Sequence, residues 1–148
     1  MTTFRSHVQY RVPYADTDRM GVIYYANYLV YFERSRNQAL DDLGMPYARL
    51  EADGLMLPVI EAHVNYKQSA GYDDVLDIYG WVSDWSGPRI RMDCEVHCNS
   101  RLLAGGYTVH ALVRRETGRP VRMPADLREL LQSAVSGASR KSSRTLEC

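Results

Sequence analysis

The chain has 148 residues and a mass of 16.9 kDa, which suits one domain with its own hydrophobic core. Hydrophobic residues make up 45% and charged residues 24%, a composition that excludes an intrinsically disordered chain. Basic and acidic residues both number 18, so the formal charge is zero and no overall attraction to nucleic acid or anionic membranes is expected.

No segment reaches the roughly 20 apolar residues that a membrane span needs, and the N-terminus lacks the apolar region of a secretory signal. The three cysteines, Cys94, Cys98 and Cys148, have neither the even count nor the CxxC spacing of a disulfide framework or a zinc site. We therefore expect a cytoplasmic protein with reduced cysteines and no metal site.

The first predicted elements are a short strand, a polar loop and a long helix. Apolar and polar residues alternate over His7–Val12, which predicts a strand that Pro13 ends. Apolar residues then recur at helical spacing from Asn27 to Leu43. Gly44 is a helix stop signal, so the predicted helix covers Asn27–Leu43.

The rest of the chain is predicted to be a run of strands in meander order, closed by a short helix. The strand-like segments are Leu57–Lys67, Val75–Trp85, Ile90–Cys98 and Leu103–Arg115. In the last of these, the alternation predicts that Leu103, Gly105, Tyr107, Val109, Ala111 and Val113 point inward. A short amphipathic helix is predicted over Pro124–Val135, and residues 136–148 are expected to form a disordered tail.

These elements predict an α+β domain over residues 1–135, in which one curved antiparallel sheet wraps around one helix. Alternating strands that follow one another favour an antiparallel sheet with one buried face, and the long helix must cover that face. The edges of such a sheet need partners. We expect a homodimer through edge-to-edge strand pairing, and a homotetramer as a dimer of dimers.

The segment from Asp16 to Tyr28 has the composition of a reaction site. It places two carboxylates, a glycine and three tyrosines just before the predicted helix begins. A helix start has unpaired N–H groups that can polarise a carbonyl, and a nearby carboxylate can act on the same carbonyl as a nucleophile or base. This combination indicates acyl transfer or hydrolysis.

The pattern Y-x-D-T-D-x-x-G-V-x-Y-Y-x-N-Y from Tyr14 to Tyr28, followed by the sequence FERSR from Phe32, resembles the signature of the 4-hydroxybenzoyl-CoA thioesterase family. That family includes the acyl-CoA thioesterases associated with the Tol-Pal system. The resemblance covers about Tyr10 to Glu116. It implies the hotdog fold, hydrolysis of an acyl-CoA to a carboxylic acid and CoA, and no metal or redox cofactor.

The resemblance also assigns roles to two residues. Asp18 matches the active-site carboxylate, which acts as a nucleophile or as a general base. Tyr25 matches the position whose backbone N–H polarises the thioester carbonyl. The Tol-Pal-associated enzymes usually have histidine there, whereas this chain has Tyr25 between Tyr24 and Ala26, which slightly favours bulkier or aromatic acyl groups over short ones.

Six further residues are candidates for substrate binding. Tyr24, Asn27 and Tyr28 surround the predicted site, although tyrosines there also suit a subunit interface. The phosphates of CoA need basic side chains, and the candidates are Lys67, Arg89 and Arg91. Asp16 is expected to stabilise the loop through its own backbone.

Two other functions compete with hydrolysis. A hotdog hydratase or dehydratase acts on acyl thioesters with a histidine and an acidic partner, and the absence of histidine between Asp16 and Tyr28 counts against it. A non-catalytic acyl-CoA binding module would bind the thioester without turnover.

Overall fold

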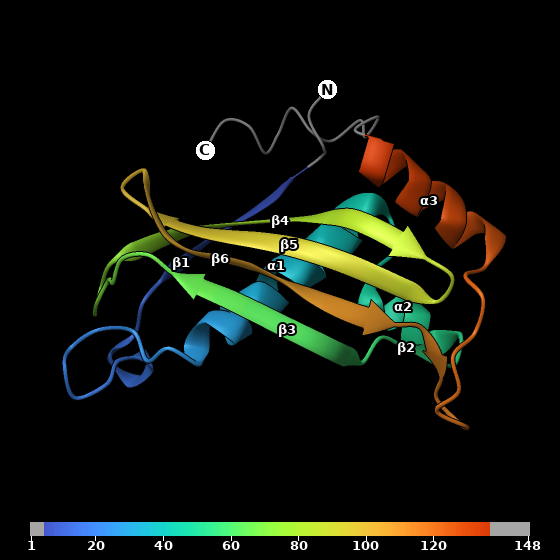
Figure 1. Cartoon of the computed structure of the whole chain (residues 1–148), viewed down its shortest axis with the longest axis horizontal. Helices are drawn as coiled ribbons and strands as arrows, with labels where there is room; N and C mark the ends of the chain where they lie inside the picture. The colour runs from blue at the N-terminus through green and yellow to red at the C-terminus, as the bar shows by residue number, and fades with distance from the viewer. Residues whose placement is uncertain (1–4, 137–148) are drawn as a thin grey trace.

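A five-stranded antiparallel sheet curves around one long helix in the computed structural model, which describes residues 5–136 (Figure 1). The central helix α1 spans Asn27–Leu43, the bounds that the sequence predicts. The strands of the sheet are β1 (Ser6–Arg11), β3 (Val59–Tyr66), β4 (Val75–Ser86), β5 (Arg89–Cys98) and β6 (Arg101–Ala111). The predicted α+β architecture is confirmed.

The strand order in the sheet is β1-β4-β5-β6-β3, with every neighbouring pair antiparallel. The strands β4, β5 and β6 form the predicted meander. The prediction is wrong for β3, which lies beside β6 at one edge while β1 pairs with β4 at the other. Hydrophobic alternation reports which face of a strand is buried and does not identify its neighbour, so the crossover from β3 to β4 left no local signal.

The predicted inward face of β6 is wrong in its central part. Met92 and Ile90 of β5 are buried and pair with Thr108 and His110, so these polar residues point toward α1 and Tyr107 points outward. The ladder is irregular between residues 96 and 97 of β5, opposite the start of β6. Because small and polar residues occupy the helix-facing side of β6, its hydropathy alternation predicts the opposite face as the buried one.

The helix α1 packs closely against the sheet through its buried side. Tyr31, Phe32 and Leu40 are among the buried residues of this side, and each large buried side chain contributes about 1.5–3 kcal/mol. Gly80 of β4 lets the helix approach, because a Cβ there would overlap the Ser35 hydroxyl oxygen. The helix ends at Gly44, whose φ of 89° is the left-handed cap that glycine favours.

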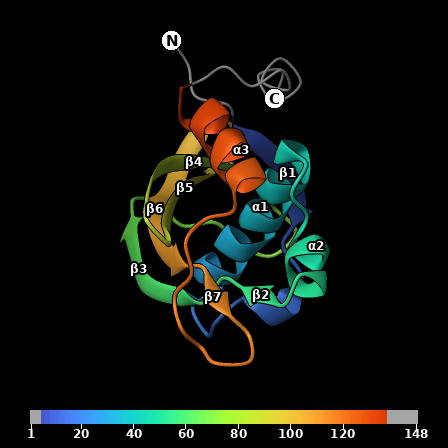
Figure 2. The ribbon, with the colours of Figure 1, turned by 90° about the vertical axis from the view of Figure 1, so that its right-hand side faces the viewer.

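The shorter elements lie at both ends of the sheet (Figure 1). The 3-10 turn η1 (Tyr14–Asp16) lies beside the start of α1. The opposite end carries α2 (Tyr47–Ala52), the two-stranded ladder of β2 (Leu55–Met56) and β7 (Val113–Arg114), and α3 (Ala125–Ser136). Figure 2 shows α3 beside one end of β4, above α1. Leu127 and Leu131 of α3 join the same core cluster as Leu40, so α3 covers the end of the sheet that α1 leaves open.

The cysteines Cys94 and Cys98 are buried and free, as predicted. Cys148 and most of the predicted tail over 136–148 lie outside the described residues. Within residues 5–136, no helix is both long and apolar enough to cross a bilayer.

Candidate active site

The loop that precedes α1 folds back onto the start of the helix. Thr17 forms a bridge with Ile23, and the Asp18 N–H donates to the Val22 carbonyl oxygen at 2.8 Å. The Tyr24 N–H then donates to the Asp16 carbonyl oxygen at 2.9 Å. The loop is therefore a tight hairpin whose two ends meet at the helix start.

Asp16 anchors this hairpin to the core. One oxygen of its carboxylate, Oδ2, accepts hydrogen bonds from the hydroxyls of Tyr10 at 3.0 Å and Tyr31 at 2.8 Å. Its backbone oxygen also accepts from the Asn27 side chain at 2.9 Å. Burial, followed by the Asp16 contact, raises the pKa of both tyrosines, so they remain hydrogen-bond donors. The predicted loop-stabilising role of Asp16 extends to a network that reaches β1 and α1.

The two carboxylate oxygens of Asp18 differ in their hydrogen bonding. Its Oδ1 accepts hydrogen bonds from the backbone N–H groups of Met20 at 2.8 Å and Val22 at 3.4 Å. Its Oδ2 accepts none from the described residues. The carboxylate is half-buried and oriented by its own loop, with one oxygen left for chemistry.

The start of α1 leaves two backbone donors open. The first backbone hydrogen bonds of the helix are donated by Asn27 to the Tyr24 carbonyl at 2.9 Å, by Tyr28 to the Tyr25 carbonyl at 3.3 Å and by Leu29 to the Ala26 carbonyl at 3.2 Å. The N–H groups of Tyr25 and Ala26 themselves have no acceptor within the part of the chain that the structure describes. Such amides at a helix start carry the partial positive charge that stabilises an oxyanion.

Tyrosine rings surround these open amides. Tyr24 and Tyr25 are exposed, with ring centroids 4.8 Å apart, and Tyr25 is 61% exposed. Tyr66, at the end of β3, donates its hydroxyl to the Tyr25 carbonyl at 3.0 Å and packs edge-on against Tyr28. Tyr28 is only 3% exposed, and burial raises its pKa to about 12. Tyr24 and Tyr25 can therefore meet a ligand or a partner, whereas Tyr28 packs the core of its own protomer.

Sequence reasoning did not find Tyr10, Tyr31 or Tyr66. Tyr31 follows Asn27 by four residues, which places both on one side of the helix. This spacing could have indicated that Tyr31 reaches the same loop as Asn27. Tyr66 bonds across 41 positions of sequence, and no local pattern reports such a contact. Asn27, predicted to bind substrate, ties the loop to the helix through its side-chain amide, and its role toward a substrate stays a prediction.

The three residues predicted to bind CoA phosphates do not meet within one protomer. The Lys67 N–H donates to the Leu103 carbonyl at 2.7 Å, whereas Arg89 pairs with Ala111. Leu103 and Ala111 are eight residues apart on β6, a separation of about 26 Å along a strand. Lys67 therefore lies near the start of α1, and the two arginines lie at the opposite end of the sheet.

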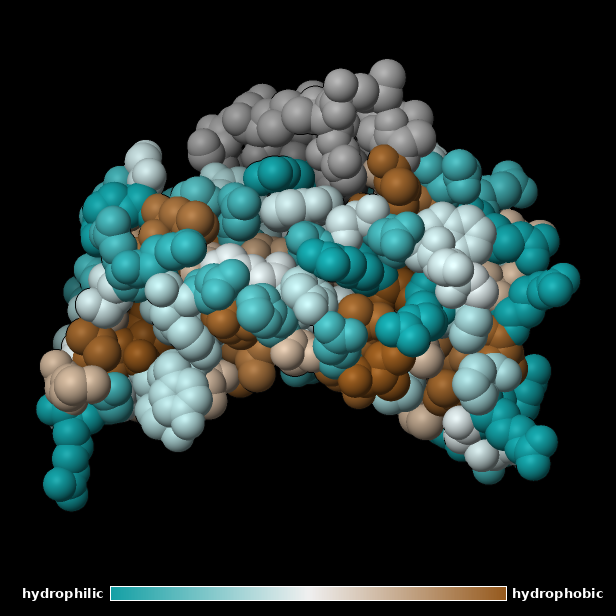
Figure 3. All heavy atoms as spheres, viewed as in Figure 1, coloured by the Kyte–Doolittle hydropathy of each residue, from teal (hydrophilic) through white to brown (hydrophobic). Residues whose placement is uncertain are grey.

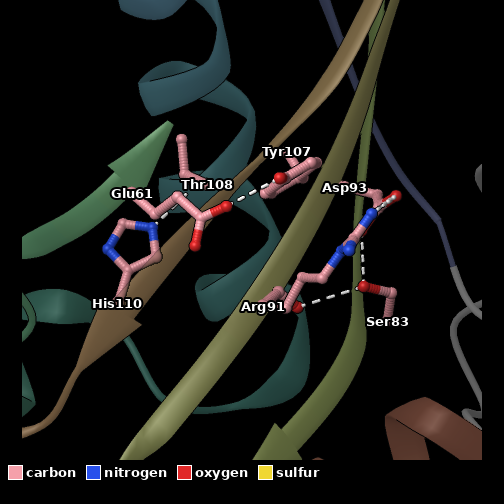
Figure 4. Close-up of polar contacts among 7 residues, drawn as sticks. All are labelled: Glu61, Ser83, Arg91, Asp93, Tyr107, Thr108 and His110. Carbon is pink, nitrogen blue, oxygen red and sulfur yellow. Dashed lines mark hydrogen bonds and ion pairs between the residues drawn. The ribbon is translucent and has the colours of Figure 1, made fainter. Parts of the chain in front are cut away.

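Arg91 is already paired on the outer face of the sheet (Figure 4). Its guanidinium donates to Asp93 at 2.9 Å and lies 3.9 Å above the Tyr107 ring. The Asp93 hydrogen bond raises the pKa of Arg91, and the Tyr107 hydroxyl donates to Glu61 at 2.7 Å. Arg89 and Arg91 both border a cavity of about 230 Å³ on this outer face.

An apolar groove of about 230 Å³ lies between α1 and β3. Its apolar walls include Leu29, Phe32, Val59 and Ala62. Figure 3 shows hydrophobic residues along the hollowed lower edge of the molecule, where β3 lies in Figure 1. Within residues 5–136, no cluster of three or more His, Cys, Asp or Glu residues could hold a metal ion.

An antiparallel sheet around a central helix, with a carboxylate loop folded onto the open start of that helix, defines a hotdog protein suited to acyl-group chemistry. Residues 12–131 match the model of the thioesterase-like superfamily. The chain therefore belongs to this superfamily, whose hotdog acyl-CoA thioesterases include YbgC. The predicted resemblance, the hotdog fold and the family's enzyme class, thioester hydrolase, are confirmed.

Individual relatives agree with this placement. The chain is 30% identical to YneP of Bacillus subtilis over 118 residues, 79% of this chain and 86% of that protein. It is 32% identical to the acyl-CoA thioesterase YbgC of Haemophilus influenzae over 119 residues, 80% of this chain and 88% of that protein. The solved structure of a DHNA-CoA thioesterase from Staphylococcus aureus superposes with a TM-score of 0.85 at 31% identity, covering 89% of this chain and 91% of that one.

Proposed function

We propose that this protein hydrolyses an acyl-CoA to a carboxylic acid and CoA, with Asp18 as the reacting carboxylate and the Tyr25 N–H as the group that polarises the carbonyl. The observation that supports this most directly is that two open groups belong to one hydrogen-bonded unit of loop and helix start. Asp18 Oδ2 and the Tyr25 N–H both lack partners among residues 5–136, while Asp16 ties the loop to the helix start.

The chemistry follows from these two groups. The Tyr25 N–H donates to the thioester carbonyl oxygen and stabilises the negative charge that develops on it. Asp18 Oδ2 either attacks the carbonyl carbon or removes a proton from a water molecule that attacks it. In the first case the CoA thiolate leaves, a mixed anhydride forms, and water then cleaves the anhydride to restore Asp18. In both cases the thiolate takes up a proton and the acyl group becomes a carboxylic acid.

The surroundings of Tyr25 favour a bulky or aromatic acyl group. Tyr24 and Tyr25 present exposed rings at the helix start, and the groove between α1 and β3 has apolar walls. Aromatic rings stack well on other aromatic or planar groups. The structural relative from Staphylococcus aureus is described as acting on an aromatic acyl-CoA, DHNA-CoA, which agrees with this preference.

A homodimer would complete the site. The edge strand β3 is exposed over most of its length and offers unpaired backbone groups. Antiparallel pairing of β3 with its own copy about a two-fold axis places the Arg89 end of one subunit beside the Lys67 end of the other. This pairing would gather the basic residues that one protomer holds apart, so that CoA phosphates bind across the interface. Assembly into a dimer of dimers is a further proposal that light scattering can measure.

The decisive experiment compares Asp18→Asn with wild type in thiol release from a panel of aliphatic and aromatic acyl-CoAs. We expect a loss of about 10³-fold or more in kcat, because the carboxylate takes part in the reaction. Asp73→Asn is the matched control: Asp73 is exposed and has a φ of 73°, which asparagine tolerates. A folded Asp18→Asn protein with the wild-type rate would remove Asp18 from the mechanism.

Two further readouts separate the competing functions. A hydratase would convert an unsaturated acyl-CoA to a hydroxyacyl-CoA without releasing thiol, which mass spectrometry of the products detects. A binding module would bind acyl-CoA in a calorimeter and release no thiol from any substrate of the panel.

A further inference from the structure

The middle of α1 places a charged side chain in the apolar groove. Arg36 borders this groove, and its side chain is 13% exposed. Its Nε is buried and has no hydrogen-bond partner among the described residues. The Glu33 carboxylate lies 3.8 Å from its terminal nitrogen, too far for a hydrogen bond. A buried cation with so little compensation is costly, so its presence points to a ligand.

Thr108 of β6 lines the same groove, and its hydrogen bond to His110 determines where the Thr108 hydroxyl donates its proton (Figure 4). The Leu57 carbonyl can only accept, so the proton of the His110 ring is on Nδ1, 3.1 Å from that oxygen. His110 is 1% exposed, and burial lowers its pKa to about 4, so the ring is neutral. Its Nε2 therefore accepts from the Thr108 hydroxyl at 2.8 Å, which leaves the Thr108 oxygen as an acceptor toward the groove.

The position of Arg36 matches the far end of an acyl group. Arg36 follows Ala26 by ten residues, a rise of about 15 Å along the helix axis. Helical side chains lean toward the N-terminus, so the guanidinium lies on the order of 10 Å from the open amides. This is about the length of an extended octanoyl chain, and the apolar walls of the groove lie between.

We propose that Arg36 and Thr108 form a recognition site for a hydroxyl group at the far end of the acyl chain or ring. The hydroxyl oxygen accepts from the guanidinium, and its proton is donated to the Thr108 oxygen. A methyl group satisfies neither partner, and a carboxylate has no proton for Thr108. The preferred substrates are then acyl-CoAs with a distal hydroxyl, an inference that rests on the proposed function because it assumes entry of the acyl group from the Tyr25 end.

The test uses three matched ligands: octanoyl-CoA, ω-hydroxyoctanoyl-CoA and suberyl-CoA. Their Kd values are measured by calorimetry on the full-length Asp18→Asn protein, and kcat/KM is measured on wild type. We expect ω-hydroxyoctanoyl-CoA to bind about tenfold more tightly than octanoyl-CoA, and more tightly than suberyl-CoA. Arg36→Met and Thr108→Val, each combined with Asp18→Asn, should remove most of this preference.

Two controls keep the test decisive. Thr117→Val makes the same substitution in an exposed turn and should keep the preference. Thr108→Ser retains the side-chain hydroxyl, so it should retain the preference for ω-hydroxyoctanoyl-CoA. This variant keeps the test valid even if the Thr108→Val protein does not fold. Equal Kd values for the octanoyl and hydroxyoctanoyl ligands, or tightest binding of suberyl-CoA, would overturn the recognition site.

The outcomes for the two proposals are distinguishable. Turnover of octanoyl-CoA without a hydroxyl preference would overturn the recognition site and keep the thioesterase. A hydroxyl preference in binding, with no thiol release by wild type from any acyl-CoA of the aliphatic and aromatic panel, would overturn hydrolysis and keep the recognition site. Absence of binding by all three ligands would overturn the recognition site, and thiol release from the aromatic acyl-CoAs of the panel would then decide the thioesterase by itself.

Discussion

The start and the middle of α1 differ in how their buried polar side chains are hydrogen-bonded. At the start, Asp16 accepts hydrogen bonds from Tyr10, Tyr31 and Asn27, so the groups that shape the loop are satisfied within the protomer. In the middle, Arg36 has a buried nitrogen without a partner. Satisfied groups hold a site in place, whereas open groups are available to a ligand. Five predictions test this contrast, from the largest expected effect to the smallest.

Asp16→Ala should cost the most stability. It removes the acceptor of two tyrosine hydroxyls, and a network of this kind is worth about 4 kcal/mol in the free energy of unfolding. Urea denaturation measures the loss. Asp18→Ala is the matched control and should cost less than about 1 kcal/mol, because its carboxylate serves only its own half-buried loop. Equal costs at the two positions would contradict the assignment of Asp16 as the structural carboxylate.

Lowering the pH should destabilise the protein through His110. Its pKa is about 4 in the folded state and about 6.5 in the unfolded state, so the unfolded chain binds more protons between these values. Stability is therefore full above pH 6.5 and falls by up to about 3 kcal/mol as the pH approaches 4. Urea denaturation at pH 7 and pH 4.5 measures the difference.

His110→Gln is the control for this pH dependence. Glutamine can donate to the Leu57 carbonyl and accept from Thr108 without titrating. The stability difference between the two pH values should shrink by the contribution of one group. An unchanged difference would assign the pH dependence to other residues.

Gly80→Ala should cost about 2 kcal/mol, because the added methyl group overlaps the Ser35 hydroxyl where α1 touches β4. Ser35→Ala removes that oxygen, so the same glycine substitution should cost less than about 1 kcal/mol in the Ser35→Ala protein. Thermal denaturation of the four proteins completes the cycle. An unchanged cost in both backgrounds would show that the helix and strand are not in contact there.

Tyr66→Phe should lower stability by about 1 kcal/mol or less, the value of one exposed hydrogen bond. Because this hydroxyl holds the Tyr25 carbonyl, we expect a larger relative effect on kcat than on KM in thiol release. Tyr72→Phe, at an exposed tyrosine in the turn before β4, is the matched control and should leave both values unchanged. A Tyr66→Phe protein with wild-type kcat would show that this contact does not position the amide.

Arg36→Met should leave the free energy of unfolding unchanged or raise it slightly. The substitution replaces a poorly compensated buried cation by an apolar side chain of similar length. A loss of more than about 2 kcal/mol in urea denaturation would mean that Arg36 is a structural residue, which contradicts the contrast between the two parts of α1.

The sequence predicted the elements best where one periodicity held over many residues. The helix over Asn27–Leu43 and the strand from residue 90 to Cys98 were predicted within a residue of their observed bounds. The candidate site was also predictable in part, because Asp18 and Tyr25 lie within one continuous motif. The face of β6 was not, since Thr108 and His110 occupy helix-facing positions that hydropathy assigns to the outside.

By itself, the sequence determined the central helix, the strand content and the loop that brings a carboxylate to a helix start. These features depend on residues close together in the chain, whose periodicity and turn chemistry are local. Only the tertiary structure decided that β3 lies beside β6, that Asp16 rather than Asp18 is bound by tyrosines, and that Arg36 and Thr108 meet in one groove. These contacts join residues far apart in the chain, and packing selects them because it must fill the core and satisfy its polar groups together.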